Sequence, residues 1–153
     1  MQLFVDMDGV LADFDRHHAA VFGIRACKIA DNVDWAAVRA VPDFYLGIPP
    51  MVDMGALWAR IERYKPIVLT GIPSAARVPE AADKKRAWVR RHLGDEVEVI
   101  CCRAKEKCLH AAPVDILIDD WEKHRHLWLK AGGRWITHIS ASETDRVLTK
   151  MGL

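Results

Sequence analysis

The chain of 153 residues has few cysteines, no long apolar run and almost no net charge, and each shortage excludes a class of protein. Its four cysteines, an adjacent pair and two scattered members, match neither a disulfide framework nor a familiar zinc knuckle, so we expect reduced thiols. No apolar run approaches the ~18 residues of a membrane span, and the acidic start is unlike a signal peptide. A net charge of +1 gives no reason to expect a nucleic acid polymer as a partner. We therefore expect a cytoplasmic protein that binds no membrane.

The composition itself is that of an ordinary globular protein. Hydrophobic residues make up 51% of the chain and charged residues 28%. A chain of this length can bury a sufficient core without disulfides or structural metals. We predict a single domain over residues 1–153.

Short apolar runs alternate with segments whose hydrophobic residues recur at helical spacing. This alternation is typical of a parallel sheet covered by helices on both faces, so we predict an α/β protein with a three-layer Rossmann-like core. The five predicted strands are residues 2–6, 67–70, 97–101, 116–119 and 135–139. A last helix is predicted over about 142–151, with Val147, Leu148 and Met151 facing the core.

The segment from residue 23 to residue 53 interrupts the alternation. It contains one short predicted helix, near residues 35–39, followed by a proline-rich run. A connection this long after the first strand and helix is more typical of a lid that contacts a substrate than of a simple loop. We predict a small helical cap here, whose aromatic residues Trp35, Phe44 and Tyr45 either stack on a nucleobase or form the cap's own small core.

Two aspartates, Asp6 and Asp8, follow the first predicted strand, and Gly9 comes directly after them. Side chains at i and i+2 of an extended chain share a face, so both carboxylates can point toward one site. Two neighbouring carboxylates repel each other unless a cation or a proton compensates for their charge. The pattern therefore indicates either an ordinary turn after a strand or one part of a charged site.

Other strand ends supply polar groups that can join these acids. The second predicted strand ends in Thr70 and Gly71, whose hydroxyl and amide can approach an anion, and the fourth ends in Asp119 and Asp120. The carboxyl ends of parallel strands lie at one edge of the sheet, where ligands gather. Buried acids without partners are strongly disfavoured. A hard cation such as Mg²⁺ would relieve the repulsion and would bind a substrate phosphate as well.

Four stretches of the chain resemble the haloacid dehalogenase (HAD) superfamily of phosphohydrolases, and within it the 5'(3')-deoxyribonucleotidase-like members and related small phage and bacterial hydrolases. The stretches occur in the family's order and span most of the predicted core. They are Asp6-Met7-Asp8-Gly9-Val10-Leu11-Ala12-Asp13-Phe14, Thr70-Gly71, Lys85-Arg86-Ala87-Trp88-Val89 with His92-Leu93-Gly94, and Leu117-Ile118-Asp119-Asp120. The resemblance implies a HAD-like fold and a Mg²⁺-dependent phosphatase.

The resemblance also implies a role for each matching acid. Asp6 would be the nucleophile that forms an aspartyl-phosphate, and Asp8 would be the general acid and base. Mg²⁺ would be held by the Asp6 side chain, the Asp8 main-chain carbonyl and the pair Asp119-Asp120, with Asp120 favoured. Relatives that cleave carbon–halogen bonds lack the second acid, and ATPase-type members replace it with threonine. Asp8 therefore favours phosphatase or phosphomutase chemistry.

Phosphate binding is implied for Thr70, for the Gly71 amide and for one lysine of the third matching stretch. The family spacing favours Lys85, with the adjacent Lys84 as the alternative. Nucleotidase relatives also have an arginine and a lysine after the third strand. The spacing differs in this chain, so Lys105 is either a phosphate or structural contact or part of a solvated charge run.

We expect from these features a Mg²⁺-dependent phosphomonoester hydrolase that acts on a small phosphorylated metabolite, with a nucleoside monophosphate as the leading substrate class. The alternative is a non-catalytic nucleotide-binding or partner-binding protein on the same scaffold. A binding protein has no need of an acid and base at Asp8, and this favours the enzyme. The sequence does not indicate an oligomeric state.

Overall fold

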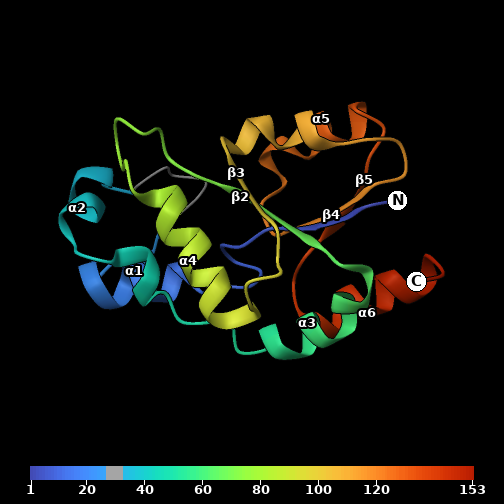
Figure 1. Cartoon of the computed structure of the whole chain (residues 1–153), viewed down its shortest axis with the longest axis horizontal. Coiled ribbons are helices and arrows are strands. Elements are labelled where there is room, and N and C mark those ends of the chain that lie inside the picture. The colour runs from blue at the N-terminus through green and yellow to red at the C-terminus, as the bar shows by residue number, and fades with distance from the viewer. Residues whose placement is uncertain (27–32) are drawn as a thin grey trace.

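The computed structural model describes residues 1–26 and 33–153, and Cys27 and part of the predicted cap lie outside these ranges. The chain folds into a five-stranded sheet with helices on both faces (Figure 1). The strands are β1 (Leu3–Val5), β2 (Ile67–Gly71), β3 (Val99–Cys102), β4 (Ile116–Asp119) and β5 (Arg134–Thr137). The predicted α/β class, with its parallel sheet, is confirmed, and the strand bounds differ from the predicted ones at most by two residues at either end.

The order of the strands places β1 at the centre of the sheet. All pairings are parallel, and the order is β3-β2-β1-β4-β5. Val5, the last residue of β1, is in register with Val68 of β2 and Ile118 of β4. The chain runs outward from β1 to one edge and then crosses to the other side, so the strand order reverses at β1. In open parallel sheets, ligands bind beside the carboxyl ends at such a switch point.

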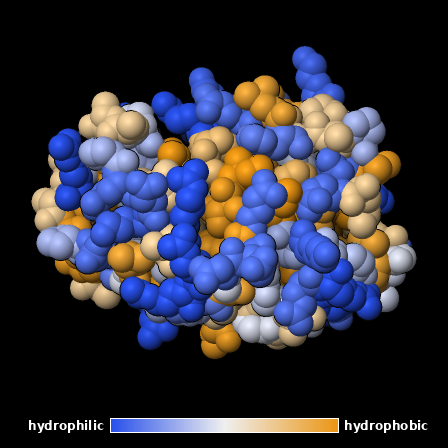
Figure 2. Space-filling view, in the orientation of Figure 1, coloured by the Kyte–Doolittle hydropathy of each residue, from blue (hydrophilic) through white to orange (hydrophobic). Residues whose placement is uncertain are grey.

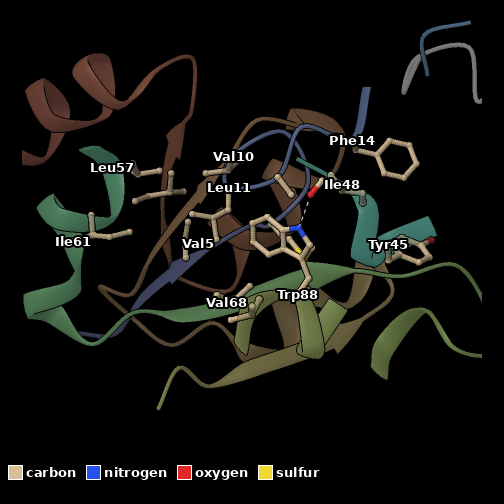
Figure 3. Packing of buried hydrophobic residues seen from close by; sticks show 14 of the residues in the cluster. Val5, Val10, Leu11, Phe14, Tyr45, Ile48, Leu57, Ile61, Val68 and Trp88 are labelled. Carbon is tan, nitrogen blue, oxygen red and sulfur yellow. Dashed lines mark hydrogen bonds between the residues drawn. The ribbon is translucent and has the colours of Figure 1, made fainter. Parts of the chain in front are cut away.

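Each face of the sheet is covered by its own hydrophobic cluster. The larger cluster joins Val5 and Val68 to side chains such as Trp88, Leu57 and Ile61 of the helices below the sheet in Figure 1 (Figure 3). The smaller one packs Phe4, Leu69 and Leu117 against Trp128 on the opposite face. Alternate residues of β1 thus enter different clusters, as the period of two in a strand requires. The result is the three-layer arrangement of helix, sheet and helix.

The helices have clear local signals at several of their ends. The Asp34 side chain accepts hydrogen bonds from the first turn of α2, and Ser140 does the same for α6. Gly23, in the left-handed conformation, ends α1. The α-helices are α1 (Phe14–Phe22), α2 (Trp35–Ala40), α3 (Met54–Ile61), α4 (Ala81–Leu93), α5 (Arg125–Lys130) and α6 (Ala141–Lys150), and 3₁₀ helices are η1 (Phe44–Gly47), η2 (Glu62–Tyr64), η3 (Ala104–His110) and η4 (Glu122–His124).

The core face of the last helix differs in part from its prediction. Leu148 is fully buried, as expected, and Met151 is partly buried against the larger cluster. Val147 was expected to face the core and is exposed instead. The inward residue one turn before Leu148 is Thr144, which lies four positions earlier and therefore on the same face of the helix. The prediction from hydrophobic residues was wrong for Val147, because the polar Thr144 occupies a buried position of this helix face.

The described part of the segment between residues 23 and 53 contains α2 and η1 and is fastened to α4. The Trp88 indole donates a hydrogen bond of 2.7 Å to the carbonyl of Ile48 (Figure 3). Lys84 forms an ion pair with Asp43, which precedes η1. Beyond η1, Pro50 pairs with Ala12 in an isolated bridge. These contacts hold η1 beside the first turn of the chain after β1.

Hydrophilic side chains cover most of the face seen in Figure 2, and hydrophobic residues are visible only in separate patches between them. None of the helices in the two described ranges combines the length and the apolar character needed to cross a membrane.

Three of the four cysteines lie in the described ranges. Cys101, Cys102 and Cys108 are free thiols.

A buried histidine makes the stability of this fold sensitive to acid. His138 is buried and shares a hydrogen bond of 2.8 Å between its Nδ1 and the Thr144 hydroxyl. Burial lowers the pKa of His138, and the nearby charge of Asp53 opposes this only in part. Below about pH 6.5 the unfolded chain therefore takes up a proton that the folded chain does not, and folding stability falls as the pH falls.

We predict that the stability advantage of wild type over His138→Gln shrinks between pH 7 and pH 5. The single proton involved sets an upper limit of about 1.4 kcal/mol per pH unit. Urea unfolding of both proteins at several pH values measures the difference. A stability difference that does not change with pH would contradict the prediction.

Candidate functional site

The chain turns sharply just after β1, and this turn presents Asp6 and Asp8. The Asp6 amide donates to the Ile118 carbonyl at 2.8 Å, so Asp6 continues the pairing with β4. The carbonyl of Met7 then accepts hydrogen bonds from the amides of Leu11 and Ala12, both at 2.8 Å. The Met7 side chain is fully buried, and the acids on either side of it lie at the wall of a cavity. The apolar residue between the two acids thus anchors the turn in the core.

Gly9 is required in this turn for two separate reasons. Its φ of +85° lies in the left-handed region that favours glycine. A Cβ atom at this position would lie only 2.6 Å from the carboxyl carbon of Asp120. The glycine therefore lets the first turn of the chain approach the acid that follows β4.

Three of the predicted acids lie together at the carboxyl edge of the sheet. One carboxylate oxygen from each of Asp6, Asp119 and Asp120 lies within 4.8 Å of the other two. Asp6 and Asp119 are buried, and Asp120 is partly exposed. The central strand β1 and its neighbour β4 supply this group, as expected for a site at the switch point.

Lys107, from η3, is the buried cation of this group. Its Nζ lies 2.9 Å from Asp6 Oδ1 and 2.7 Å from Asp119 Oδ2. The other oxygen of Asp119 accepts a hydrogen bond of 2.8 Å from the Trp121 amide. Both oxygens of Asp119 are therefore oriented by protein groups.

Opposing electrostatic effects act on this buried pair. Burial raises the pKa of Asp119 and the charge of Asp6 raises it further, while Lys107 lowers it and leaves a net increase. Burial alone would lower the pKa of Lys107, but the charges of Asp6 and Asp119 outweigh burial and raise it. Lys107 thus remains an ammonium group, and burial is the main reason that the pKa of Asp119 stays above its ordinary value.

Asp8 belongs to a second cluster, arranged around Lys85. The Lys85 Nζ donates to Asp8 Oδ2 at 2.6 Å, to the Thr70 hydroxyl at 2.9 Å and to the Gly71 carbonyl at 2.8 Å. Lys85 is almost fully buried. The adjacent Lys84 instead forms an ion pair with Asp43, away from Asp8. Of the two lysines considered from the sequence, Lys85 is the one that the fold brings to the acids.

The Tyr45 ring of η1 covers this second cluster. Lys85 Nζ lies 5.5 Å from the centroid of the ring. Burial raises the pKa of the Tyr45 hydroxyl, and the charge of Asp8 adds to this effect. The segment predicted as a cap thus brings an aromatic side chain to the Asp8 and Lys85 pair.

A cavity of about 290 Å³ opens above both clusters. Asp6, Asp8 and Lys107 line it, together with the Gly71 backbone. Its aromatic wall consists of Phe14, Trp35, Tyr45 and Trp121, and its basic wall of Arg77, Arg103, Lys105 and Lys123. Thr70 and Lys85 are not among its lining residues and lie behind Asp8. In this geometry they orient Asp8 rather than line the space that a ligand would fill.

The donor set around Asp6 suits a hard divalent cation. The Asp6, Asp119 and Asp120 group offers only carboxylate oxygens, the ligands that Mg²⁺ prefers. Lys107 pairs with Asp6 and Asp119 of this group, and Lys85 pairs with the neighbouring Asp8. The Asp8 carboxylate is turned toward Lys85, so its predicted part in metal binding is limited here to its main chain.

Lys107 is the site residue that sequence reasoning missed. Arg103, Lys105 and Lys107 alternate along the chain, and an extended segment would place all three on one face. The segment forms the 3₁₀ helix η3 instead, with about three residues per turn, so Lys105 and Lys107 point in different directions. Lys105 is exposed at the cavity wall, whereas the Lys107 ammonium group contacts the carboxylates of Asp6 and Asp119. The alternation gave no signal that distinguished them.

Comparisons with protein-family models and with curated proteins found no match for this chain.

We predict that Lys107→Met destabilises the protein by about 3–5 kcal/mol at pH 8, because it removes the ammonium group that contacts the two buried carboxylates of Asp6 and Asp119. The matched variant Lys105→Met removes an exposed charge from the same helix and should change stability by no more than about 0.5 kcal/mol. Urea unfolding measures both. Equal effects of the two substitutions would show that Lys107 is not the stabilising partner.

We predict that Gly9→Ala destabilises the protein by about 1–3 kcal/mol, because the new Cβ meets both an unfavourable φ and the Asp120 carboxylate. Gly55→Ala is the control, since Gly55 lies within α3 with no atom near its added Cβ and should gain about 0.5–1 kcal/mol. Thermal unfolding compares the two variants with wild type. A Gly9→Ala protein as stable as wild type would refute the close contact between Gly9 and the Asp120 carboxylate.

Proposed function

We propose that this protein is a Mg²⁺-dependent phosphomonoester hydrolase that works through an aspartyl-phosphate, as its resemblance to the HAD superfamily implies. The observation that supports it most is the placement of Asp6 and Asp8. Both line the same cavity, yet Asp6 belongs to the group of three acids and Asp8 to the cluster around Lys85. Two carboxylates in different environments suit the two different roles of nucleophile and acid/base.

In the first step, the Asp6 carboxylate attacks the phosphorus atom of the substrate. A bond forms between a carboxylate oxygen and phosphorus while the bond to the leaving oxygen breaks. Asp8, in its protonated form, transfers its proton to that oxygen and releases an alcohol. Lys107 orients Asp6 for the attack through its contact with Oδ1.

In the second step, water hydrolyses the aspartyl-phosphate on Asp6. Asp8 is now a carboxylate and removes a proton from the water, whose oxygen attacks phosphorus. The bond between phosphorus and Asp6 breaks, so inorganic phosphate leaves and both acids return to their starting states. Lys85 keeps the Asp8 side chain in one position through both steps, because its other two hydrogen bonds fix the ammonium group.

Asp6 and the pair Asp119 and Asp120 would hold the Mg²⁺ ion, with Asp119 fixed by Lys107 and by the Trp121 amide. When bound, the ion lets an anionic nucleophile approach an anionic phosphoryl group and stabilises the charge that develops on it. A group of three neighbouring carboxylates supports a divalent rather than a monovalent ion. Oxygen ligands support Mg²⁺ over softer metals.

The leaving group would face the aromatic wall. Phe14, Trp35 and Tyr45 line one side of the cavity, and a planar group could stack on an aromatic face there. The volume of about 290 Å³ suits a small metabolite. A nucleoside monophosphate remains the first substrate class to assay.

We predict that wild type releases phosphate from a panel of phosphomonoesters only with Mg²⁺ and that Asp6→Asn lowers kcat at least about 10³-fold. The amide cannot supply the anionic nucleophile. Malachite-green detection of phosphate, with and without EDTA, measures both effects. Asp95→Asn, an exposed acid on a surface ion pair, is the matched control and should retain wild-type activity. Wild type that is inactive on the whole panel, or an active Asp6→Asn, would overturn the proposal.

We predict a different result for Asp8→Asn with p-nitrophenyl phosphate. Its leaving group departs as a stable anion and needs no proton, so the first step survives, whereas the second step lacks its base. Stopped-flow absorbance should therefore show a burst of about one p-nitrophenolate per chain, followed by turnover about 10²–10⁴-fold below wild type. Steady turnover at the wild-type rate would rule out the acid/base role of Asp8.

A further inference from the structure

One side of the cavity wall concentrates positive charge that the proposed reaction does not use. Lys105 of η3, Lys123 of η4 and His124 at the end of η4 line the cavity together. Burial lowers the pKa of His124, and the charges of Lys123 and Lys105 are among the causes that lower it further. The two ammonium groups therefore lie near the same imidazole and repel each other.

These cations lack the acidic partners that the other lysines of the site have. Within residues 1–26 and 33–153, neither Lys105 nor Lys123 forms an ion pair. Lys123 instead lies 5.2 Å from the centre of the Trp121 ring, a contact that holds its ammonium group at the wall. By contrast, Lys85 and Lys107 are both neutralised by aspartates. Uncompensated cations at a cavity wall favour an anionic ligand.

The positive charges that line the cavity indicate how many anionic groups that ligand has. Arg77 and Arg103 line the cavity together with Asp6, and their two charges match in number those of one phosphoryl dianion. The charges of Lys105 and Lys123 remain for a second anionic group.

We propose that Lys105, Lys123 and His124 bind a second anionic group on the leaving portion of the substrate. The substrate class would then be a phosphomonoester with a further phosphate or carboxylate rather than a simple monophosphate. This inference rests on the proposed phosphatase function, because Asp6 defines the end at which the first phosphate binds. It makes the wall a specificity site rather than part of the reacting centre.

The separation between the two ends suits a small molecule. Lys105 and Lys107 are two residues apart on η3, and two residues of a 3₁₀ helix rise by about 4 Å. Lys107 contacts Asp6, and Lys105 points away from it into the wall. Asp6, Lys105 and Lys107 line the same cavity of about 290 Å³, so a metabolite with two anionic groups on one short carbon skeleton or one nucleoside can reach both ends.

The test compares matched substrates that differ by one anionic group. The pairs are adenosine 5'-monophosphate with adenosine 3',5'-bisphosphate, fructose 6-phosphate with fructose 1,6-bisphosphate, and glycerol 3-phosphate with 3-phosphoglycerate. We expect kcat/KM of wild type to be at least about tenfold higher for the doubly anionic member of one or more pairs. One favourable charged contact strengthens binding by about tenfold. The first two pairs test a second phosphate, and the third tests a carboxylate.

The wall variant Lys105→Gln/Lys123→Gln should abolish this preference and lower turnover of the singly anionic member much less. The control Lys130→Gln/Lys150→Gln removes the same charge from two exposed lysines that do not line the cavity. The control should keep the preference, which excludes an effect of net charge alone. Equal rates for both members in wild type, or an equal loss for both in the wall variant, would overturn the proposal. So would faster release of phosphate from the end of a short oligonucleotide than from every small substrate.

Calorimetric binding of the same pairs in EDTA separates this inference from the proposed function. Tighter binding of the doubly anionic member, lost in the wall variant, would support the second subsite even if no substrate were hydrolysed, and the hydrolase proposal alone would then fail. Hydrolysis of the panel without any preference, in rates or in binding, would leave the hydrolase and refute the subsite.

Discussion

The repulsion among four carboxylates at one edge of the sheet is the constraint on which the rest of this site depends. Asp6, Asp8, Asp119 and Asp120 meet where β1 and β4 end, and the protein compensates with two buried lysines, Lys85 and Lys107. Each lysine holds a different acid, so the two acids of the first turn have distinct surroundings. Three of these acids, Asp6, Asp119 and Asp120, lie close enough together to offer a divalent cation the oxygen ligands that it prefers.

The architecture serves this arrangement. β1 is short and fully buried, and it ends at the centre of the sheet, where the strand order reverses. Gly9 allows the following turn to come within contact of Asp120, which a side chain would prevent. Tyr45 then covers the Lys85 cluster from η1, and the bond from Trp88 to Ile48 holds that segment in place. A buried core on both faces of the sheet supports acids that repel each other.

Features that follow from local patterns could be predicted from the sequence, and features that depend on three-dimensional packing could not. Five apolar runs predicted the parallel sheet, and acids after two of them predicted where charge would gather. The sequence favoured Lys85 over Lys84 only through the family spacing. In the structure the two side chains point in different directions from α4, so Lys85 reaches Asp8 and Lys84 reaches Asp43. Lys107 could not be distinguished from Lys105, because the 3₁₀ conformation of η3 decides which one enters the acids. The burial of Thr144 in place of Val147 depends on its contact with His138, which no pattern along the chain reveals.

The most direct test of the central claim is a crystal structure of the protein with Mg²⁺ and beryllium trifluoride, which mimics a phosphoryl group on a carboxylate. We expect beryllium bonded to an oxygen of Asp6 and one Mg²⁺ ion beside it on Asp6 and Asp120. We also expect Asp8 to keep its contact with Lys85 and to face the fluorides. Beryllium bonded to any other residue, or a metal ion held away from these acids, would contradict the proposed roles of Asp6 and Asp120.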